Sequence, residues 1–353
     1  MRILGIETSC DETAAAVVSR TAEDGPLLLQ SNVVASQVDL HAETGGVVPE
    51  VAARAHLAAL VPVVRRALAD AECGWDDLDA IAVTRGPGLP GALLIGFNAA
   101  RGLAYARDLP LIPVDHIEGH VAANWLPAGA GGASVGDEAE TPPALPALAL
   151  VVSGGHTELL LMEEHGRFVR LGGTRDDAAG EAFDKVARLL DLPYPGGPPI
   201  SRLAATATVR KTRLPRAWLR GTDDFSFSGL KTAVANLVAS EGAPPSAEVA
   251  WAFEESVCDV LAKKAARAAE REGVASLLVA GGVAANRRLR ERIREESPVP
   301  VHIPPPVLCT DNGAMIAAAA FRHLDEAVPA ETALDIFSTA VRKAAVKRST
   351  SVR

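Results

Sequence analysis

Two histidines four positions apart, His116 and His120, are the residues of this sequence best suited to hold a metal ion. Side chains at positions i and i+4 of a helix share one face, so both imidazoles can reach a single ion. Asp311 lies in a polar CTDNG segment at 309–313 and could add a carboxylate to the pair. The alternatives are two surface histidines and an aspartate that only caps the helix after it.

The histidine pair matches the H-E-x-x-H signature of zinc peptidases only in part. In those enzymes the glutamate that acts as the base directly follows the first histidine. Here Glu118 comes one position later, and Gly119 follows it within the expected helix. A metallopeptidase is therefore the weaker alternative for this site.

Three polar turns each follow a strand-like run, at 8–13, 153–157 and 281–286. Backbone N–H groups and hydroxyls in such turns bind phosphate, and an acid such as Asp11 can hold a phosphate-bound cation. The sequence has no Walker G-x-x-x-x-G-K-[ST] motif. Together the turns favour a nucleotide-type ligand between two lobes. A kinase or an ATPase of the same fold would bind such a ligand too, and is therefore an alternative.

The elements that would position these residues alternate between strands and helices. A strand, a polar turn and a second strand occur at 2–18 and again at 148–162, which predicts two related lobes. Other strands are expected at 79–84, 110–114 and 277–280, and helices at 52–70, broken at Pro62, at 287–296 and at 312–323. We expect an α/β fold with mixed sheets. Its parts are a first lobe at 1–127, a flexible Gly/Ala/Pro-rich loop at 128–146, a second lobe at 147–323 and a tail at 324–353.

Composition and charge restrict the kind of protein. The net charge of −9 argues against broad, non-specific binding to nucleic acid. The stretch 210–220 nevertheless carries five cations and no acid, as either a solvated surface or an RNA contact. The four cysteines form no C-x-x-C pair, which predicts reduced thiols and a cytoplasmic protein. No signal peptide and no membrane span are expected.

Seven motifs, taken in order, resemble the TsaD family of tRNA N6-adenosine threonylcarbamoyltransferases. They are GIETSCDET (5–13), HIEGH (116–120), VSGGHT (152–157), GEAFDK (180–185), FSFSGLK (225–231), AGGVAAN (280–286) and CTDNGAM (309–315). The resemblance implies a two-lobed fold of the actin/Hsp70/sugar-kinase (ASKHA) type. It also implies transfer of a threonylcarbamoyl group from threonylcarbamoyl-AMP to N6 of adenosine 37 in tRNAs that read codons beginning with A, with release of AMP.

The same resemblance implies roles for individual residues. It implies one divalent metal ion, iron or zinc, on His116, His120 and Asp311. It gives Asp11 and Glu12 as acids that face the site and are candidates for a base. It implies partners similar to TsaB and TsaE, besides tRNA. The contacts to the donor that it implies are Val151, Val152, Ser153, Gly154, Gly155, Asp184, Gly197 and Asn286.

Overall fold

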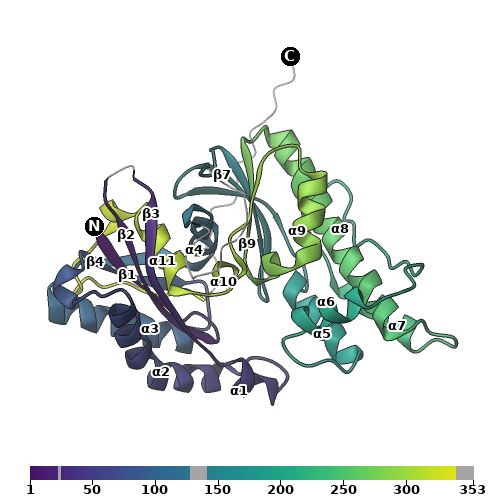
Figure 1. Cartoon of the computed structure of the whole chain (residues 1–353), viewed down its shortest axis with the longest axis horizontal. Helices are drawn as coiled ribbons and strands as arrows, with labels where there is room; N and C mark the ends of the chain where they lie inside the picture. The colour runs from purple at the N-terminus through teal and green to yellow at the C-terminus, as the bar shows by residue number, and fades with distance from the viewer. Residues whose placement is uncertain (23–24, 128–140, 339–353) are drawn as a thin grey trace.

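Two five-stranded mixed sheets form the core of the computed structural model, which describes residues 1–22, 25–127 and 141–338 (Figure 1). The first sheet has the order β3-β2-β1-β4-β5. Its strands are β1 (Arg2–Glu7), β2 (Glu12–Arg20), β3 (Leu27–Ser36), β4 (Ala80–Gly86) and β5 (Leu111–Asp115). The second sheet has the order β10-β9-β6-β7-β8. Its strands are β6 (Ala147–Val152), β7 (Thr157–Glu164), β8 (Arg167–Gly173), β9 (Ser276–Ala280) and β10 (Val301–His302).

The two sheets share one topology. In each, the first strand pairs antiparallel with the second and parallel with the fourth, so β1, β2 and β4 correspond to β6, β7 and β9. The hairpins β1–β2 and β6–β7 are the two predicted strand–turn–strand segments. This confirms the predicted α/β fold with duplicated mixed sheets.

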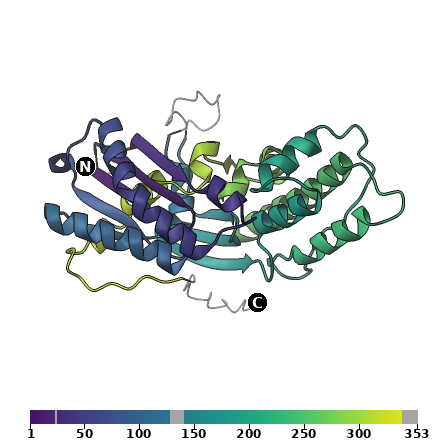
Figure 2. The same cartoon turned by 90° about the horizontal axis from the view of Figure 1, so that it is seen from below.

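Helices cover both faces of the first sheet and the outer face of the second sheet. The strands β1 and β6 are buried on both faces, and therefore read as nearly continuous apolar runs. One face of the first sheet packs against α2 (Pro49–Asp70) and α3 (Pro90–Arg107), and the other against α11 (Gly313–Ala320). The outer face of the second sheet carries a larger core of α5 (Ala179–Leu189), α6 (Gly197–Ala205), α7 (Ser228–Val238), α8 (Ser246–Glu272) and α9 (Arg287–Glu296). Figure 2 shows the layer of α2 and α3 at one end of the molecule and the layer of α5 to α9 at the other end.

The short helix α4 (His116–Ala122) lies between the two sheets (Figure 1). Ile117 and Val121 pack against the inner face of the second sheet, whereas Ala122 packs with α11 and the first sheet. The helix that carries both histidines is therefore held from two sides. The remaining short elements are α1 (Val38–Ala42), α10 (Pro306–Cys309) and the 3-10 turns Trp75–Asp77, Ala123–Trp125, Gly282–Ala285 and Leu324–Glu326.

The structure differs from the expected division of the chain at α11. This helix packs on β1 and β2, so residues 313–320 complete the first lobe although they were expected in the second, at 147–323. Two glycines allow the close approach. A Cβ added to Gly5 would lie 2.2 Å from the carbonyl oxygen of Gly313. Val328 then pairs with Leu111 of β5, which keeps this part of the expected tail on the first lobe.

Other differences are smaller. The helix expected at 52–70 begins at Pro49 and runs unbroken through Pro62, whose ring lies on the exposed side. The helix expected at 312–323 spans only Gly313–Ala320. Most of the expected flexible loop, 128–140, and the basic end of the tail, 339–353, lie outside the described residues. Within the described ranges, no helix combines the length and apolar character needed to cross a bilayer.

Candidate active site

The two histidines stand at the start of α4. Asp115, the last residue of β5, caps the helix, because its Oδ1 accepts hydrogen bonds from the backbone N–H groups of Ile117 at 2.8 Å and Glu118 at 3.2 Å. His116 is thus the first helical residue and His120 follows one turn later. Both side chains are buried, and their ring centroids are 4.7 Å apart. The i, i+4 prediction for this pair is confirmed.

Asp311 joins the histidines from the other side of the fold. Its Oδ1 lies 3.1 Å from Nε2 of His120 and 3.7 Å from Nε2 of His116. The cap of the following helix is the neighbouring Asn312, whose Oδ1 accepts from the backbone N–H of Met315 at 2.9 Å. The alternative that Asp311 serves only as a helix cap is therefore excluded.

The donor set fits a divalent transition metal. One ligand atom each from His116, His120 and Asp311 lie within 4.8 Å of one another. Both ring nitrogens of His120 are buried and have no hydrogen-bond partner among the described residues, since the contact to Asp311 is close but poorly aligned. Burial alone would raise the pKa of Asp311, but the two imidazoles outweigh it and hold that pKa well below its usual range. An ionised carboxylate beside two imidazoles suits iron or zinc.

A residue that the sequence did not single out, Glu7, supports His116. Glu7 is fully buried at the end of β1, and its Oε2 lies 3.0 Å from Nδ1 of His116. Thr84 donates its hydroxyl to the same oxygen at 2.6 Å, and the backbone N–H of Ser9 donates to the other. A carboxylate on the second nitrogen fixes the orientation of a metal-binding imidazole. A charged residue at the end of an otherwise apolar strand was the available signal.

The electrostatics of His116 reflect this arrangement. Burial lowers its pKa, but Asp311 and Glu7 together outweigh burial and raise it to about 9. Without a metal the imidazole therefore holds a proton near neutral pH. Since a metal binds the neutral imidazole, loading the site releases that proton.

The first polar turn places Glu12 close to Asp11 and to Asp311. Burial and the charges of Asp11 and Asp311 raise the pKa of Glu12 to about 9, and its Oε1 accepts from the hydroxyl of Ser36 at 2.8 Å.

The second turn lies at the end of β6. The side chains of Val151 and Val152 are buried in the cores on opposite faces of the sheet, so only their backbone could meet a ligand. The turn itself is closed by Ser153, whose backbone N–H donates to the carbonyl of His156 at 2.8 Å. Gly154 and Gly155 are exposed, and a Cβ on either would meet nothing within 4 Å. The pair leaves room for a ligand to approach the backbone.

Asp184 and Gly197 lie near this turn. Asp184 Oδ1 accepts from the backbone N–H of Gly196 at 2.7 Å, and burial raises the pKa of Asp184. Gly197 begins α6 and has open space in front of it. Burial and then the charges of Asp11 and Asp184 raise the pKa of Tyr194, so acids from both lobes face this residue.

Asn286 differs from the other expected donor contacts because its side chain is fully engaged. Its Oδ1 caps α9 by accepting from the backbone N–H of Leu289 at 2.9 Å. Its Nδ2 donates to the hydroxyl of Ser201 at 3.0 Å and to Glu254 at 2.8 Å. The side chain thus ties α6, α8 and α9 together, and its backbone is the part left for a ligand.

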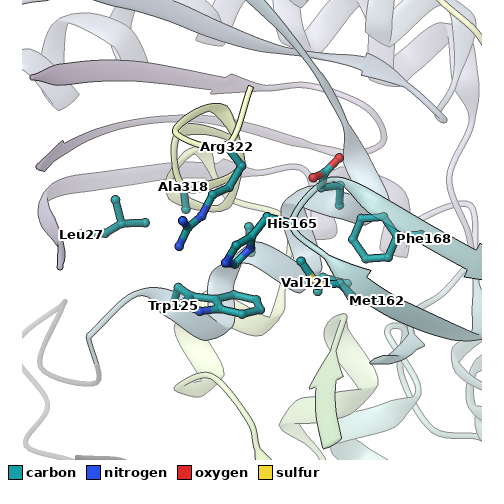
Figure 3. A pocket seen from close by; sticks show the side chains of 10 residues that line it. Leu27, Val121, Trp125, Met162, His165, Phe168, Ala318 and Arg322 are labelled. Carbon is teal, nitrogen blue, oxygen red and sulfur yellow. The ribbon is translucent and has the colours of Figure 1, made fainter. Parts of the chain in front are cut away.

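A very small cavity, of about 10 Å³, lies on the other face of α4 (Figure 3). Glu118, Val121 and Trp125 point toward it, whereas His116 and His120 occupy the opposite side of the helix. Met162 and His165 of the second lobe and Arg322 after α11 complete the wall. The cavity belongs to the packing between the lobes and is separate from His116, His120 and Asp311.

Comparison with known proteins identifies the family. The sequence profile of TsaD, described as tRNA N6-adenosine threonylcarbamoyltransferase, matches residues 29–318. Proteins with this name from Thermomicrobium roseum and Bacillus cereus are 52% and 54% identical to the chain. The first covers 95% of both sequences and the second 90% of both.

Solved structures with low sequence identity share the fold alone. HypF from T. kodakarensis superposes with a TM-score of 0.60 at 15% identity, over 92% of this chain and 48% of that one. Component A of (R)-2-hydroxyglutaryl-CoA dehydratase from Acidaminococcus fermentans gives 0.52 at 15% identity, over 92% and 99%. The fold is of the ASKHA type. From its sequence and the length of its matches, the chain belongs to the TsaD family of tRNA N6-adenosine threonylcarbamoyltransferases.

Proposed function

We propose that this chain transfers a threonylcarbamoyl group from threonylcarbamoyl-AMP to N6 of adenosine 37 in tRNAs that read codons beginning with A, and releases AMP. Its membership of the family supports the reaction. The observation in the fold that carries the proposal is a buried His–His–Asp cluster between two lobes, with polar turns from both sheets beside it. A cytoplasmic location follows from a tRNA substrate and from cysteines that form no disulfide among the described residues.

In this proposal His116, His120 and Asp311 hold one divalent ion, iron or zinc. When bound, the ion supplies a positive charge that offsets the negative charge of the departing AMP. Glu7 orients His116, and the exposed backbone at Gly154 and Gly155 offers N–H donors to phosphate.

The reaction itself needs positioning more than activation, because the carbonyl carbon of the donor is already part of a mixed anhydride. A bond forms between N6 of adenosine and that carbon, and the bond to the AMP oxygen breaks. In this proposal Asp11 or Glu12 accepts the proton that N6 loses. Holding the two substrates together beside the His–His–Asp cluster supplies a large part of the rate.

The partners of the reaction are also part of the proposal. Leu57 and Val61 are exposed one turn apart on α2, and Leu94 is exposed on the adjoining α3, with 66%, 56% and 48% of each residue accessible. An apolar surface of this kind on packed helices suits a helical protein partner. We assign it to a TsaB-like protein of the same fold, with a TsaE-like protein joining the pair.

The test combines elemental analysis of the purified chain with threonylcarbamoyl transfer to unmodified tRNA, with and without the partner proteins. We expect about one iron or zinc per chain and N6-modified adenosine. Sustained ATP turnover by the chain alone, without a modified tRNA, would instead support the kinase or ATPase alternative. Cleavage of casein would support the peptidase alternative.

A further inference from the structure

A basic segment of the second lobe lies along α8 without forming a helix or a strand. Residues 207–222 contain five cations and no acid. Residues 207–219 have no regular secondary structure. A free chain of this composition would lose considerable entropy on binding a partner. The contacts to α8 show that this entropy is already lost in the folded protein.

Side chains of α8 hold the segment at successive points. The first contacts are from Glu248, the next from Asp259 and the last from Lys264, so the segment follows α8 from its start toward its end. Glu248 Oε1 accepts from the backbone N–H groups of Lys211 at 3.0 Å and Thr212 at 2.8 Å. Asp259 Oδ2 pairs with Nε of Arg216 at 3.0 Å. Lys264 Nζ donates to the carbonyls of Leu219 at 3.1 Å, Thr222 at 2.8 Å and Asp224 at 2.6 Å.

Near the start of α8, two arginines of this segment lie over one aromatic ring. The guanidinium carbon of Arg213 is 5.5 Å from the centre of the Trp251 ring, and that of Arg210 is 6.0 Å away. Arg210, Lys211 and Arg213 are exposed, and Trp251 is half-buried. We call these four residues the arginine–tryptophan patch.

The acids near the patch are already engaged. Glu248 accepts three hydrogen bonds from residues 211 and 212. Asp259 pairs with Arg216, Lys263 and Arg292, and although burial opposes this, the three cations lower its pKa to about 2. Over the described residues, no carboxylate forms an ion pair with the three cations of the patch. Glu248 carries its charge beside Lys211, but the three cations of the patch outnumber it, so the patch stays positive in a protein whose net charge is −9.

The patch is structurally connected to the candidate active site. Glu254 follows Trp251 by three residues on α8, and its Oε1 accepts from Ser201 at 2.6 Å and from Asn286 at 2.8 Å. Ser201 lies one turn after Gly197 on α6. Figure 1 shows α6, α7 and α8 together in the second lobe.

We propose that the arginine–tryptophan patch binds the sugar–phosphate backbone of the RNA substrate and holds it on the second lobe, beside the helices that carry Gly197 and Asn286. The inference rests on the proposed function, which supplies RNA as the substrate. Guanidiniums bind phosphate through two parallel hydrogen bonds, and the tryptophan ring holds the guanidiniums of Arg210 and Arg213 in place through cation–π contacts. Arg216 lies in the same basic stretch of the sequence but is not part of the patch, because its guanidinium is paired with Asp259.

The experiment measures binding of unmodified tRNA to the full chain, without donor, over a series of salt concentrations. In the test variant Arg210, Lys211 and Arg213 are all replaced by Gln. In the control variant Arg65, Arg66 and Arg107, three exposed cations at the far end of the first lobe, are replaced by Gln. Both variants change the net charge equally, and thermal unfolding checks that both are folded.

We expect the test variant to bind tRNA roughly 10- to 100-fold more weakly and to lower the slope of log K against log salt by about 2 to 3, because three phosphate contacts are lost. The control variant should keep both values near those of the wild type. A second variant, Trp251→Leu, should weaken binding without changing the salt slope.

Two results would overturn the inference. Equal losses in the test and control variants would mean that only net charge matters. Competition by polyglutamate as strong as competition by tRNA would indicate an acidic protein partner instead. Failure of the proposed function is distinguishable, because a wild-type chain that binds tRNA through the patch but modifies no adenosine would refute the reaction and not the patch.

Discussion

Replacing Glu7 with glutamine tests whether the buried carboxylate supports the metal-binding histidine. The change keeps the size of the side chain but removes the charge that faces Nδ1 of His116 at 3.0 Å. It also places an amide where the hydroxyl of Thr84 now donates at 2.6 Å. Loss of such a supporting partner typically lowers metal affinity about 10- to 100-fold, or roughly 1.4 to 2.7 kcal/mol.

The assay is competition for Zn²⁺ or Co²⁺ between the protein and a chromophoric chelator, which requires no catalysis. The matched control is Glu118→Gln, the same change on the opposite face of α4, where Glu118 pairs with His323 at 2.7 Å. We expect the control to keep its metal affinity within about threefold of the wild type. If Glu7→Gln folds and binds metal as tightly as the wild type, the supporting role of this carboxylate is refuted.

Three other predictions follow from the same structure. His116→Ala should abolish threonylcarbamoyl transfer and metal binding while the cooperative thermal unfolding remains, and transfer by a metal-free variant would contradict the metal's role. Gly313→Val should destabilise the protein by about 1 to 3 kcal/mol in a denaturant titration, since its Cβ would lie 2.6 Å from backbone atoms of β2. The hydrogen bond to Glu118 raises the pKa of His323 to about 9, although partial burial opposes this rise. This raised pKa means that the stabilisation by the pair is complete below about pH 6.5 and is lost as the pH rises through 9, and His323→Gln should remove this part of the pH dependence of Tm.

The parts of the fold that the sequence predicted are those set by local pattern. The helix expected at 287–296 has those bounds in the structure, because Asn286 caps it and an alternating basic and acidic pattern continues it. Both hairpins were predicted because each has two apolar runs around a polar turn. The placement of α11 was not predictable in this way, since an alanine-rich helix carries no local signal of which sheet it covers.

In the candidate site, too, local spacing was predictive, whereas contacts between distant residues were not. The spacing of His116 and His120 indicated a shared ligand because helix geometry fixes their separation. Asp311 and the cap at Asn312 are adjacent in sequence, and only the structure separates the two roles. Glu7 remained unassigned, since its contact to His116 joins residues more than a hundred positions apart.

The packing of α11 on β1 has a consequence for synthesis of the protein on the ribosome. The first strand emerges early, but the helix that fills the core beneath it is among the last parts to be made. At about 5 to 20 residues per second, the first strand waits roughly 15 to 60 seconds for α11. During that time Ala16 and Val18 lack their cover, so the nascent first lobe exposes apolar surface for a chaperone to protect. A chain truncated before Gly313 would remain in that state permanently.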